Sequence, residues 1–165
     1  MKDTPNRIAI IMGSKSDEEK MLPAINFLQD IGVPFEVRVA SAHRTPALIE
    51  QIVKNPTFKI FIAGAGMAAA LPGCIAALTN KPVIGVPLSS KYGLEDSLLS
   101  IIQMPPGIPV LTVGIDASKN AAIAACQILA LEDNEILLKL KKIRTNAADK
   151  VYDDDQAITA KYMNP

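Results

Sequence analysis

The sequence is poor in the residues that build most metal and cofactor sites. Its 165 residues include one histidine, two cysteines and no tryptophan, and aromatic residues make up only 4%. One histidine among scattered carboxylates argues against a metal centre, because a stable site needs several such ligands close together. So few aromatic rings also argue against a flavin stacked between them. We therefore expect no metal and no flavin.

The sequence also has no excess charge and no long apolar run. Lysine and arginine number 17, as do aspartate and glutamate, so the net charge is zero. Without a basic surface, neither a nucleic acid nor a membrane is an expected partner. The apolar run after the polar residues 1–7 is too short for a signal peptide or a membrane span. These absences predict a soluble cytoplasmic protein.

Apolar residues are plentiful, at 49% of the chain, and Ala, Ile, Leu and Val supply most of them. That amount suits one substantial core, and the length suits one domain. The two cysteines, Cys74 and Cys126, lie in apolar helical segments without a pairing or metal-ligand spacing. We expect both to be small core residues of a protein from a reducing compartment.

Short apolar runs alternate with helical patterns along most of the chain, at a spacing of roughly 25 residues, which is one strand and one helix. The runs cover residues 8–12, 35–40, 59–63, 82–86 and 110–113. The helical patterns cover 17–31, 46–54, a short stretch after Pro72, 94–103 and 119–131. Most of the runs are continuously apolar, which is typical of parallel strands covered on both faces. The prediction is a three-layer α/β sandwich around a flavodoxin-like parallel five-stranded sheet, with the ligand at its switch point.

The C-terminal part predicts an assembly. Residues 121–131 are apolar on almost every face, so a helix there must be covered on all sides, and we expect another subunit to contribute. A charged amphipathic helix over about 134–150, an acidic break at 153–155 and a last helical piece to Met163 should follow. We expect a single domain over 1–165, with a core over about 7–131 and C-terminal helices over about 134–163 packed on a neighbouring subunit of a homo-oligomer.

The only histidine, His43, follows one of the predicted strands in the run Ser41-Ala42-His43-Arg44-Thr45-Pro46. Histidine is the side chain that ordinarily titrates near neutral pH, and loops at the carboxyl ends of parallel strands hold ligands. Arg44 suits bidentate binding of phosphate. Thr45 and Pro46 form a helix start, as N-cap and first helical residue. The alternative is a surface histidine and arginine beside a helix cap, but the polar cluster favours a catalytic loop.

The loop after the first predicted strand contains Ser14, Ser16 and Asp17 behind Gly13. Free N–H groups at a helix start bind anions, and a carboxylate there accepts hydrogen bonds from ribose hydroxyls. A structural alternative stays open, because the pattern from Ser16 to Glu19 is a capping box. Capping in that register leaves Ser14 and Asp17 unexplained, so the loop predicts binding of a phosphate and a sugar.

A third loop, Ala63 to Gly73, is rich in small residues. Its pattern Gly64-x-Gly66-x-x-Ala69 matches the dinucleotide fingerprint, but it follows the third strand and Pro72-Gly73 interrupts the helix. No acidic residue ends the next strand to hold a ribose, so a nicotinamide cofactor is rejected. A flexible apolar loop that a flat ligand can approach closely is expected instead. The remaining chemistry is a proton moved by His43 on a phosphorylated small molecule.

Four segments together resemble the bacterial class I type of the PurE family, the N5-carboxyaminoimidazole ribonucleotide mutases of purine biosynthesis. They are Met12 to Asp17, Ser41 to Pro46, Gly64-Ala65-Gly66 with Leu71-Pro72-Gly73, and Asp96 to Pro105. The resemblance runs from about Arg7 to Asp149. It implies a flavodoxin-like fold, a homo-octamer with sites at subunit contacts, and no metal or organic cofactor. It also implies isomerisation of that ribonucleotide to 4-carboxy-5-aminoimidazole ribonucleotide, on the route to IMP, by decarboxylation and recarboxylation.

The resemblance also implies roles for individual residues. His43 is similar to the family's acid–base histidine, Asp17 to its ribose contact, and Arg44 to its phosphate-binding residue. Ser14, Ser16 and Ser41 are the other implied phosphate-binding residues. The implied substrate site further includes Ala42, Gly64, Ala65, Gly66 and Leu71.

Two alternatives to the mutase reaction stay open. Related enzymes carboxylate the aminoimidazole ribonucleotide directly with carbon dioxide, but they have lysine where this chain has Arg44. Here Met67 replaces a family glycine, Ala70 replaces a family histidine, and the loop near Tyr92 is one residue short. These departures leave room for a weakened paralogue that binds a purine intermediate.

Overall fold

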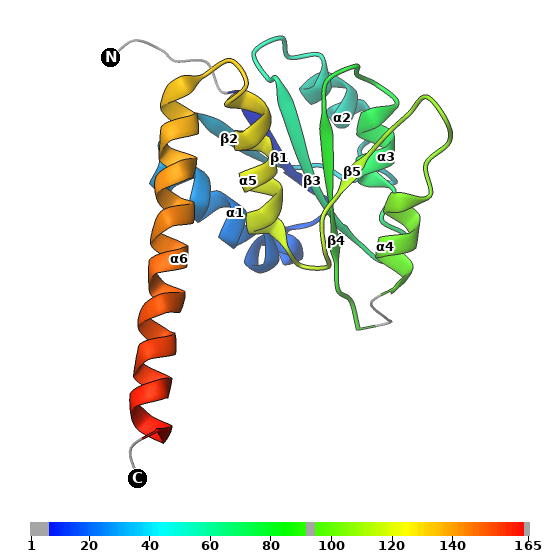
Figure 1. Cartoon of the computed structure of the whole chain (residues 1–165). Helices are drawn as coiled ribbons and strands as arrows, with labels where there is room; N and C mark the ends of the chain where they lie inside the picture. Colours follow the sequence, from blue (N-terminus) through cyan, green and yellow to red (C-terminus); the bar gives the residue numbers. More distant parts are fainter. Residues whose placement is uncertain (1–6, 92–94, 164–165) are drawn as a thin grey trace. The chain divides into compact units, whose positions relative to one another are not determined.

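Five parallel strands form one sheet in the order β2-β1-β3-β4-β5 in the computed structural model, which describes residues 7–91 and 95–163 (Figure 1). The strands are β1 (Ile8–Met12), β2 (Phe35–Val39), β3 (Ile60–Gly66), β4 (Val83–Leu88) and β5 (Leu111–Thr112). The helices are η1 (Lys15–Asp17), α1 (Glu18–Ile31), α2 (Pro46–Val53), α3 (Leu71–Ala76), α4 (Glu95–Ile102), α5 (Ser118–Leu129) and α6 (Asn134–Tyr162). This is the flavodoxin-like fold predicted from the sequence.

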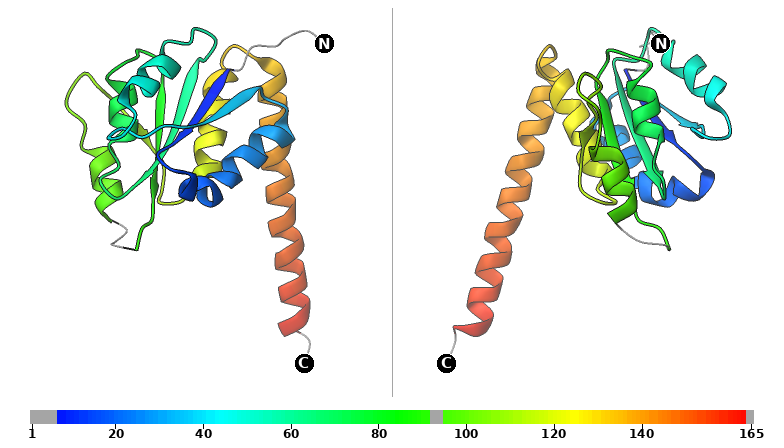
Figure 2. Two further views of the ribbon diagram at one scale, coloured as in Figure 1. Left: turned by 180° about the vertical axis from the view of Figure 1, so that it is seen from behind. Right: turned by 90° about the vertical axis from the view of Figure 1, so that its right-hand side faces the viewer.

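Helices cover both faces of the sheet, and two glycines mark which helix lies where. A Cβ on Gly64 of β3 would collide with Met21 of α1, whereas one on Gly85 of β4 would lie 2.5 Å from Ile101 of α4. Because Gly85 pairs with Ala63, and not with Gly64, the two glycines face opposite sides of the sheet. In Figures 1 and 2, α2, α3 and α4 lie together on one side and α1 on the other.

The burial and the length of each strand depend on its position in the sheet. The three central strands, β1, β3 and β4, are buried almost throughout, whereas the edge strands β2 and β5 are partly exposed. The edge strand β5 has only two residues, shorter than the predicted 110–113, because it pairs with β4 alone. In contrast, β3 continues to Gly66 beyond the predicted end at residue 63, because it pairs with β1 and then with β4 up to Leu88.

Residues 1–125 and residues 126–165 form two compact units. In the first unit, the α5 residues Ala121, Ala122 and Ala125 are buried within their own chain, so this part of the apolar helix does not need a second subunit to cover it. Cys126 is buried as expected, but Cys74 is exposed, so the prediction of a core position for Cys74 was wrong. Cys74 lies on the outer side of the short helix α3, whose buried residues include Leu71 and Ile75.

In the second unit, α6 runs without interruption through the predicted acidic break at 153–155. Three aspartates lower helix propensity only moderately, and residues 134–162 contain neither the glycine nor the proline that would end a helix. Asp133 caps the start of α6, because its carboxylate accepts the Ile136 amide over 3.3 Å. The short loop near Tyr92 and the first residue of the helix predicted over 94–103 lie outside the described residues. Within the described ranges, no helix combines the length and apolar character needed to cross a bilayer.

Candidate active site

The loops at the carboxyl ends of β1, β2, β3 and β4 surround a cleft of about 880 Å³. Its wall contains the catalytic candidate His43 and nine of the ten predicted substrate-binding residues. These nine are Ser14, Ser16, Asp17, Ser41, Ala42, Arg44, Ala65, Gly66 and Leu71. The tenth, Gly64, is not part of the wall. A side chain at this position would point toward Met21 of α1 and not into the cleft. Segments far apart in the sequence therefore meet at the end of the sheet where this fold binds ligands.

The first wall of the cleft is the turn between β1 and α1. The Asp17 carboxylate accepts the Ser14 amide over 3.0 Å, and Ser14 Oγ accepts the Ser16 amide over 3.3 Å. The capping box therefore starts at Ser14, not at Ser16 as the sequence pattern suggested, and caps the short helix η1. The expectation that capping leaves Ser14 and Asp17 unexplained was wrong. Both residues still lie in the cleft wall, so one turn supplies hydroxyls and a carboxylate.

The second wall is the loop that follows β2, and Arg44 ties it to the first. The Arg44 guanidinium donates to Ser41 Oγ over 3.2 Å and to the carbonyl oxygen of Gly13 over 3.1 Å. Both acceptors are neutral, so the positive charge of Arg44 stays available to an anion in the cleft. His43, beside it, is exposed and lines the same cleft.

Thr45 and Pro46 start helix α2, as predicted, but the Thr45 side chain does not cap it. Its hydroxyl oxygen instead accepts the Ser41 amide over 2.9 Å. Thr45 thus joins the two ends of the loop from Ser41 to Thr45, and this loop positions His43.

The third wall is the segment from Gly66 to Leu71. Residues 64–66 belong to β3, so the flexible loop predicted over 63–73 is confined to residues 67–70 between β3 and α3. Met67 and Ala69 adopt positive φ values of 56° and 38°, a region that glycine enters at little cost. Met67 is 57% exposed at the cleft.

The cleft also contains residues that sequence reasoning missed, namely Lys20, Ser89, Ser90 and Lys91. Lys20 is three positions after Asp17, and this helical spacing was the one available signal for its place in the wall. Ser89 directly follows β4 and was interpreted as part of a helix start. Their contacts join residues that are 69 positions apart in the sequence, which local patterns do not reveal.

Burial raises the pKa of the Asp17 carboxyl above its usual 3.8. The Ser14 amide, the charge of Lys20, the Gly13 amide and the charge of Arg44 each lower the pKa, in that order of size, but burial has the larger effect. The ribose-binding candidate therefore takes up a proton at a higher pH than a solvated aspartate.

Other parts of the described chain offer weaker sites. No group of three or more His, Cys, Asp or Glu among the described residues is arranged to hold a metal ion. A hollow of about 870 Å³ at the opposite ends of β4 and β5 has Lys81 as its only ionisable lining residue. A smaller hollow of about 500 Å³ borders Met67 and α4. Neither brings a histidine or an arginine to a ligand.

The sequence and the fold both match known proteins. The family model described as AIR carboxylase matches residues 7–150. The N5-carboxyaminoimidazole ribonucleotide mutase of Methanocaldococcus jannaschii is 57% identical over 151 residues, which are 92% of this chain and 96% of that protein. The mutase of Haemophilus influenzae is 46% identical, with 90% and 94% covered. The crystal structure of Treponema denticola PurE superposes with a TM-score of 0.82 at 29% identity, over 92% of this chain and 98% of that one.

Proposed function

We propose, from the premise that this chain belongs to the AIR carboxylase family, that its cleft binds N5-carboxyaminoimidazole ribonucleotide and isomerises it to 4-carboxy-5-aminoimidazole ribonucleotide. The protein is an isomerase of purine biosynthesis. The observation that carries the proposal is that one cleft gathers His43, Arg44, Asp17 and the serines of two loops. A proton carrier, an anion-binding cation and a sugar-binding carboxylate are what this substrate requires.

Different walls of the cleft bind different parts of the proposed substrate. Arg44 with Ser14, Ser16 and Ser41 holds the phosphate, and Asp17 accepts hydrogen bonds from the ribose. The aminoimidazole then lies against the small residues of the third wall, within reach of His43. No polar side chain lines that wall, so it offers an apolar surface to the carbon dioxide released there.

His43 moves one proton in each half of the reaction. When the bond between the exocyclic nitrogen and the carboxylate breaks, carbon dioxide leaves and His43 protonates that nitrogen. The enamine-like ring carbon then attacks the carbon dioxide, and His43 takes the proton from that carbon as the new bond forms. The net change is transfer of the carboxylate from nitrogen to carbon, with no net gain or loss of protons.

Turnover of the carbamate substrate by the purified protein tests this proposal, with His43→Asn as the key variant. Asparagine keeps much of the size and hydrogen bonding of histidine but transfers no proton. We expect conversion to be abolished while the affinity for the ribonucleotide stays largely intact. A His43→Asn enzyme that turns over at the wild-type rate contradicts the role of His43, and a wild-type protein that does not convert the substrate contradicts the reaction.

Direct carboxylation of the aminoimidazole ribonucleotide is the second candidate, because the matching family is named for AIR carboxylase. The relatives that are 46–57% identical are mutases, and this favours the first reaction. Supplying the protein with aminoimidazole ribonucleotide and bicarbonate, in place of the carbamate, separates the two. Faster product formation with bicarbonate supports the carboxylase.

A weakened paralogue is the third possibility, and Ala70 provides its test. Ala70 is half-buried in the cleft wall, at the position where the resemblance to the PurE family implies a histidine. If the missing imidazole limits the reaction, Ala70→His raises kcat/KM by about 2- to 10-fold, the value of one hydrogen bond. Ribonucleotide binding without turnover in both proteins supports a binding function instead.

We further propose that residues 1–165 act as one domain in a cytoplasmic homo-octamer of the class I type, in which α6 packs on a neighbouring subunit. Val151, Ile158 and Tyr162 on α6 are 66%, 59% and 71% exposed, and their spacing places them on one helix face. Replacing Ile158 and Tyr162 by lysine removes that apolar face. We expect light scattering to show a smaller assembly than that of wild type, and an unchanged mass contradicts the docking.

A further inference from the structure

Lys20 of α1 joins the residue that follows β4 to the loop between β5 and α5, and it lies in the cleft wall. Its ammonium group donates to the carbonyl oxygen and to the hydroxyl oxygen of Ser89, the latter over 2.5 Å. Lys20 Nζ also lies 3.7 Å from Asp116 Oδ1, and the two side chains are only 34% and 37% exposed. Lys20 starts on α1, Ser89 follows β4, and Asp116 lies between β5 and α5.

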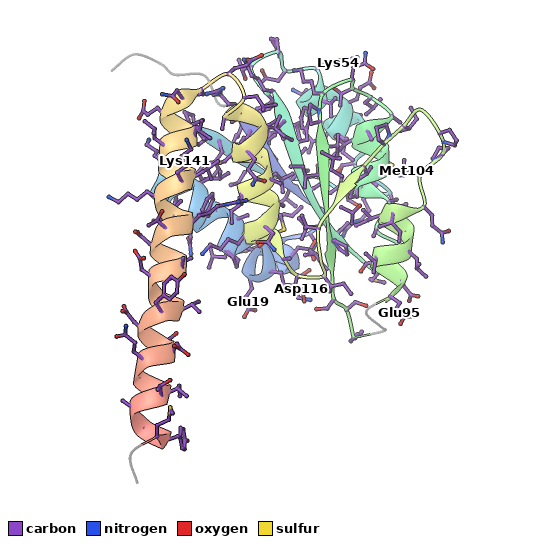
Figure 3. The ribbon with its side chains drawn as sticks, viewed as in Figure 1. Glu19, Lys54, Glu95, Met104, Asp116 and Lys141 are labelled. Atoms are coloured by element: carbon purple, nitrogen blue, oxygen red, sulfur yellow. The ribbon has the colours of Figure 1, made fainter. Side chains whose placement is uncertain are left out.

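Asp116 adopts an unusual backbone conformation that these contacts support. Its φ is 55°, which costs free energy in any residue except glycine. Its carboxylate accepts the Ser89 amide over 2.9 Å and the Ser89 hydroxyl over 2.5 Å, and its own amide donates to Pro87 over 2.9 Å. Figure 3 places Asp116 at the end of the sheet opposite Lys54, close to the start of α1 near Glu19.

The backbone of Lys20 is held as well as its side chain. The buried hydroxyl of Ser118, at the start of α5, donates to the carbonyl oxygen of Lys20 over 2.6 Å. An ammonium group has three N–H donors, of which two are used by Ser89 and the third faces Asp116. The ammonium is thus directed at Ser89 and Asp116, so Lys20 acts on the cleft through these neighbours.

We infer that Lys20 is a positioning residue of the cleft: its clamp on Ser89 and Asp116 holds the loop after β4 against the turn that carries Asp17. This inference rests on the proposed function, because it concerns the site for the ribonucleotide. With the clamp in place, Ser90 and Lys91 are held in the cleft wall, and the Lys20 charge lowers the pKa of Asp17 against the effect of burial.

Lys20→Met tests the inference, because methionine keeps an unbranched apolar stem but has no charge. We expect kcat/KM for the carbamate substrate to fall by about 10- to 100-fold, almost entirely through a higher KM. Lys20→Arg, which keeps the charge, should retain more of the affinity. Lys15→Met is the matched control, because Lys15 is exposed on the same turn but outside the cleft wall, and it should behave as wild type.

A pH profile distinguishes this role from simple loss of structure. The charged groups that face Asp17 are Lys20 and Arg44, and the cleft further contains His43 and Lys91, with Asp116 behind Lys20. In Lys20→Met, Asp17 loses a neighbouring positive charge that lowers its pKa. The pH below which ribonucleotide affinity falls should therefore be higher than in wild type. In Asp116→Ala, which removes both acceptors for Ser89 and the ion pair with Lys20 but leaves the ammonium, affinity should fall without that shift to higher pH.

The outcomes separate this inference from the proposed function. Thermal unfolding of each variant reports whether it is folded. A folded Lys20→Met protein with the KM and pH profile of wild type overturns the inference alone, and so does a loss confined to kcat. A wild-type protein that neither binds nor converts the ribonucleotide overturns the proposed function, and the role of Lys20 fails with it.

Discussion

The Arg44 guanidinium donates a hydrogen bond to the carbonyl oxygen of Gly13 across 3.1 Å, although the two residues are 31 positions apart. This bond joins the loop after β2 to the loop after β1. The catalytic candidate His43 is the residue before Arg44, and the phosphate-binding candidate Ser14 is the residue after Gly13. One side chain therefore sets the distance between the proton carrier and the anion site.

Arg44→Ala removes both that connection and a charge-assisted contact to the phosphate. We expect the Kd for the ribonucleotide to rise by about 10- to 150-fold, from a loss of roughly 1.5–3 kcal/mol. Isothermal titration measures it. Arg38→Ala is the control, because Arg38 is paired with Glu36 on β2 outside the cleft. An Arg44→Ala protein that binds as tightly as the control contradicts the assignment.

Met67→Gly should stabilise the protein. Met67 is held at a φ of 56°, where a side chain costs about 1–2 kcal/mol, whereas glycine in the unfolded chain costs about 0.5–1 kcal/mol. The net gain expected in denaturant unfolding is about 0.5–1 kcal/mol. Ala68→Gly at the next position has no positive φ to relieve and should lose stability. Equal changes in the two variants contradict the argument from strain.

Gly85→Ala should destabilise the protein, because the face of β4 toward α4 has no room for a methyl group. The added Cβ would lie 2.5 Å from Ile101 Cγ2 and 2.9 Å from Val110 Cγ1. Overpacking of this kind costs about 1–3 kcal/mol in the free energy of unfolding. At Gly114, the same substitution meets only Ala117 Cβ at 3.7 Å and should be nearly neutral.

Asp17 should make the stability of the protein depend on pH. Because burial raises its pKa in the folded state above 3.8, the folded protein binds a proton more readily than the unfolded chain does. This group therefore lowers stability above its folded pKa, and the penalty is relieved as the pH falls toward 3.8. We expect wild type to gain stability relative to Asp17→Asn over that interval in denaturant titrations. A difference that is constant with pH contradicts the raised pKa.

The fold was predictable because its signals are local. Continuous apolar runs such as Ile8–Met12 mark strands covered on both faces, and their alternation with helices leaves few topologies. The position of His43 and Arg44 after a strand placed them at the ligand-binding end of the sheet. None of this required knowledge of contacts between distant residues.

The predictions that were wrong or missing have two causes. Either two sequence patterns fitted equally well, or the residue makes its contacts with residues far away in the sequence. Ser14 with Asp17 and Ser16 with Glu19 both fit a capping pattern, and only the short helix η1 selects the first. Asp153 begins a run of aspartates that looked like a break, but nothing there prevents a helix. Lys20, Ser89 and Asp116 are ordinary residues one by one, and their role exists only once a helix and two loops meet.

Gly64, which lies just behind the cleft, links the interior of the protein to ligand recognition. Its missing side chain leaves the space that Met21 fills, and Met21 directly follows Lys20 on the first helix. Any larger residue at that strand position must displace the buried Met21 side chain, on the helix that holds Lys20. A change made wholly inside the hydrophobic interior would thus also be detected as weaker ribonucleotide affinity.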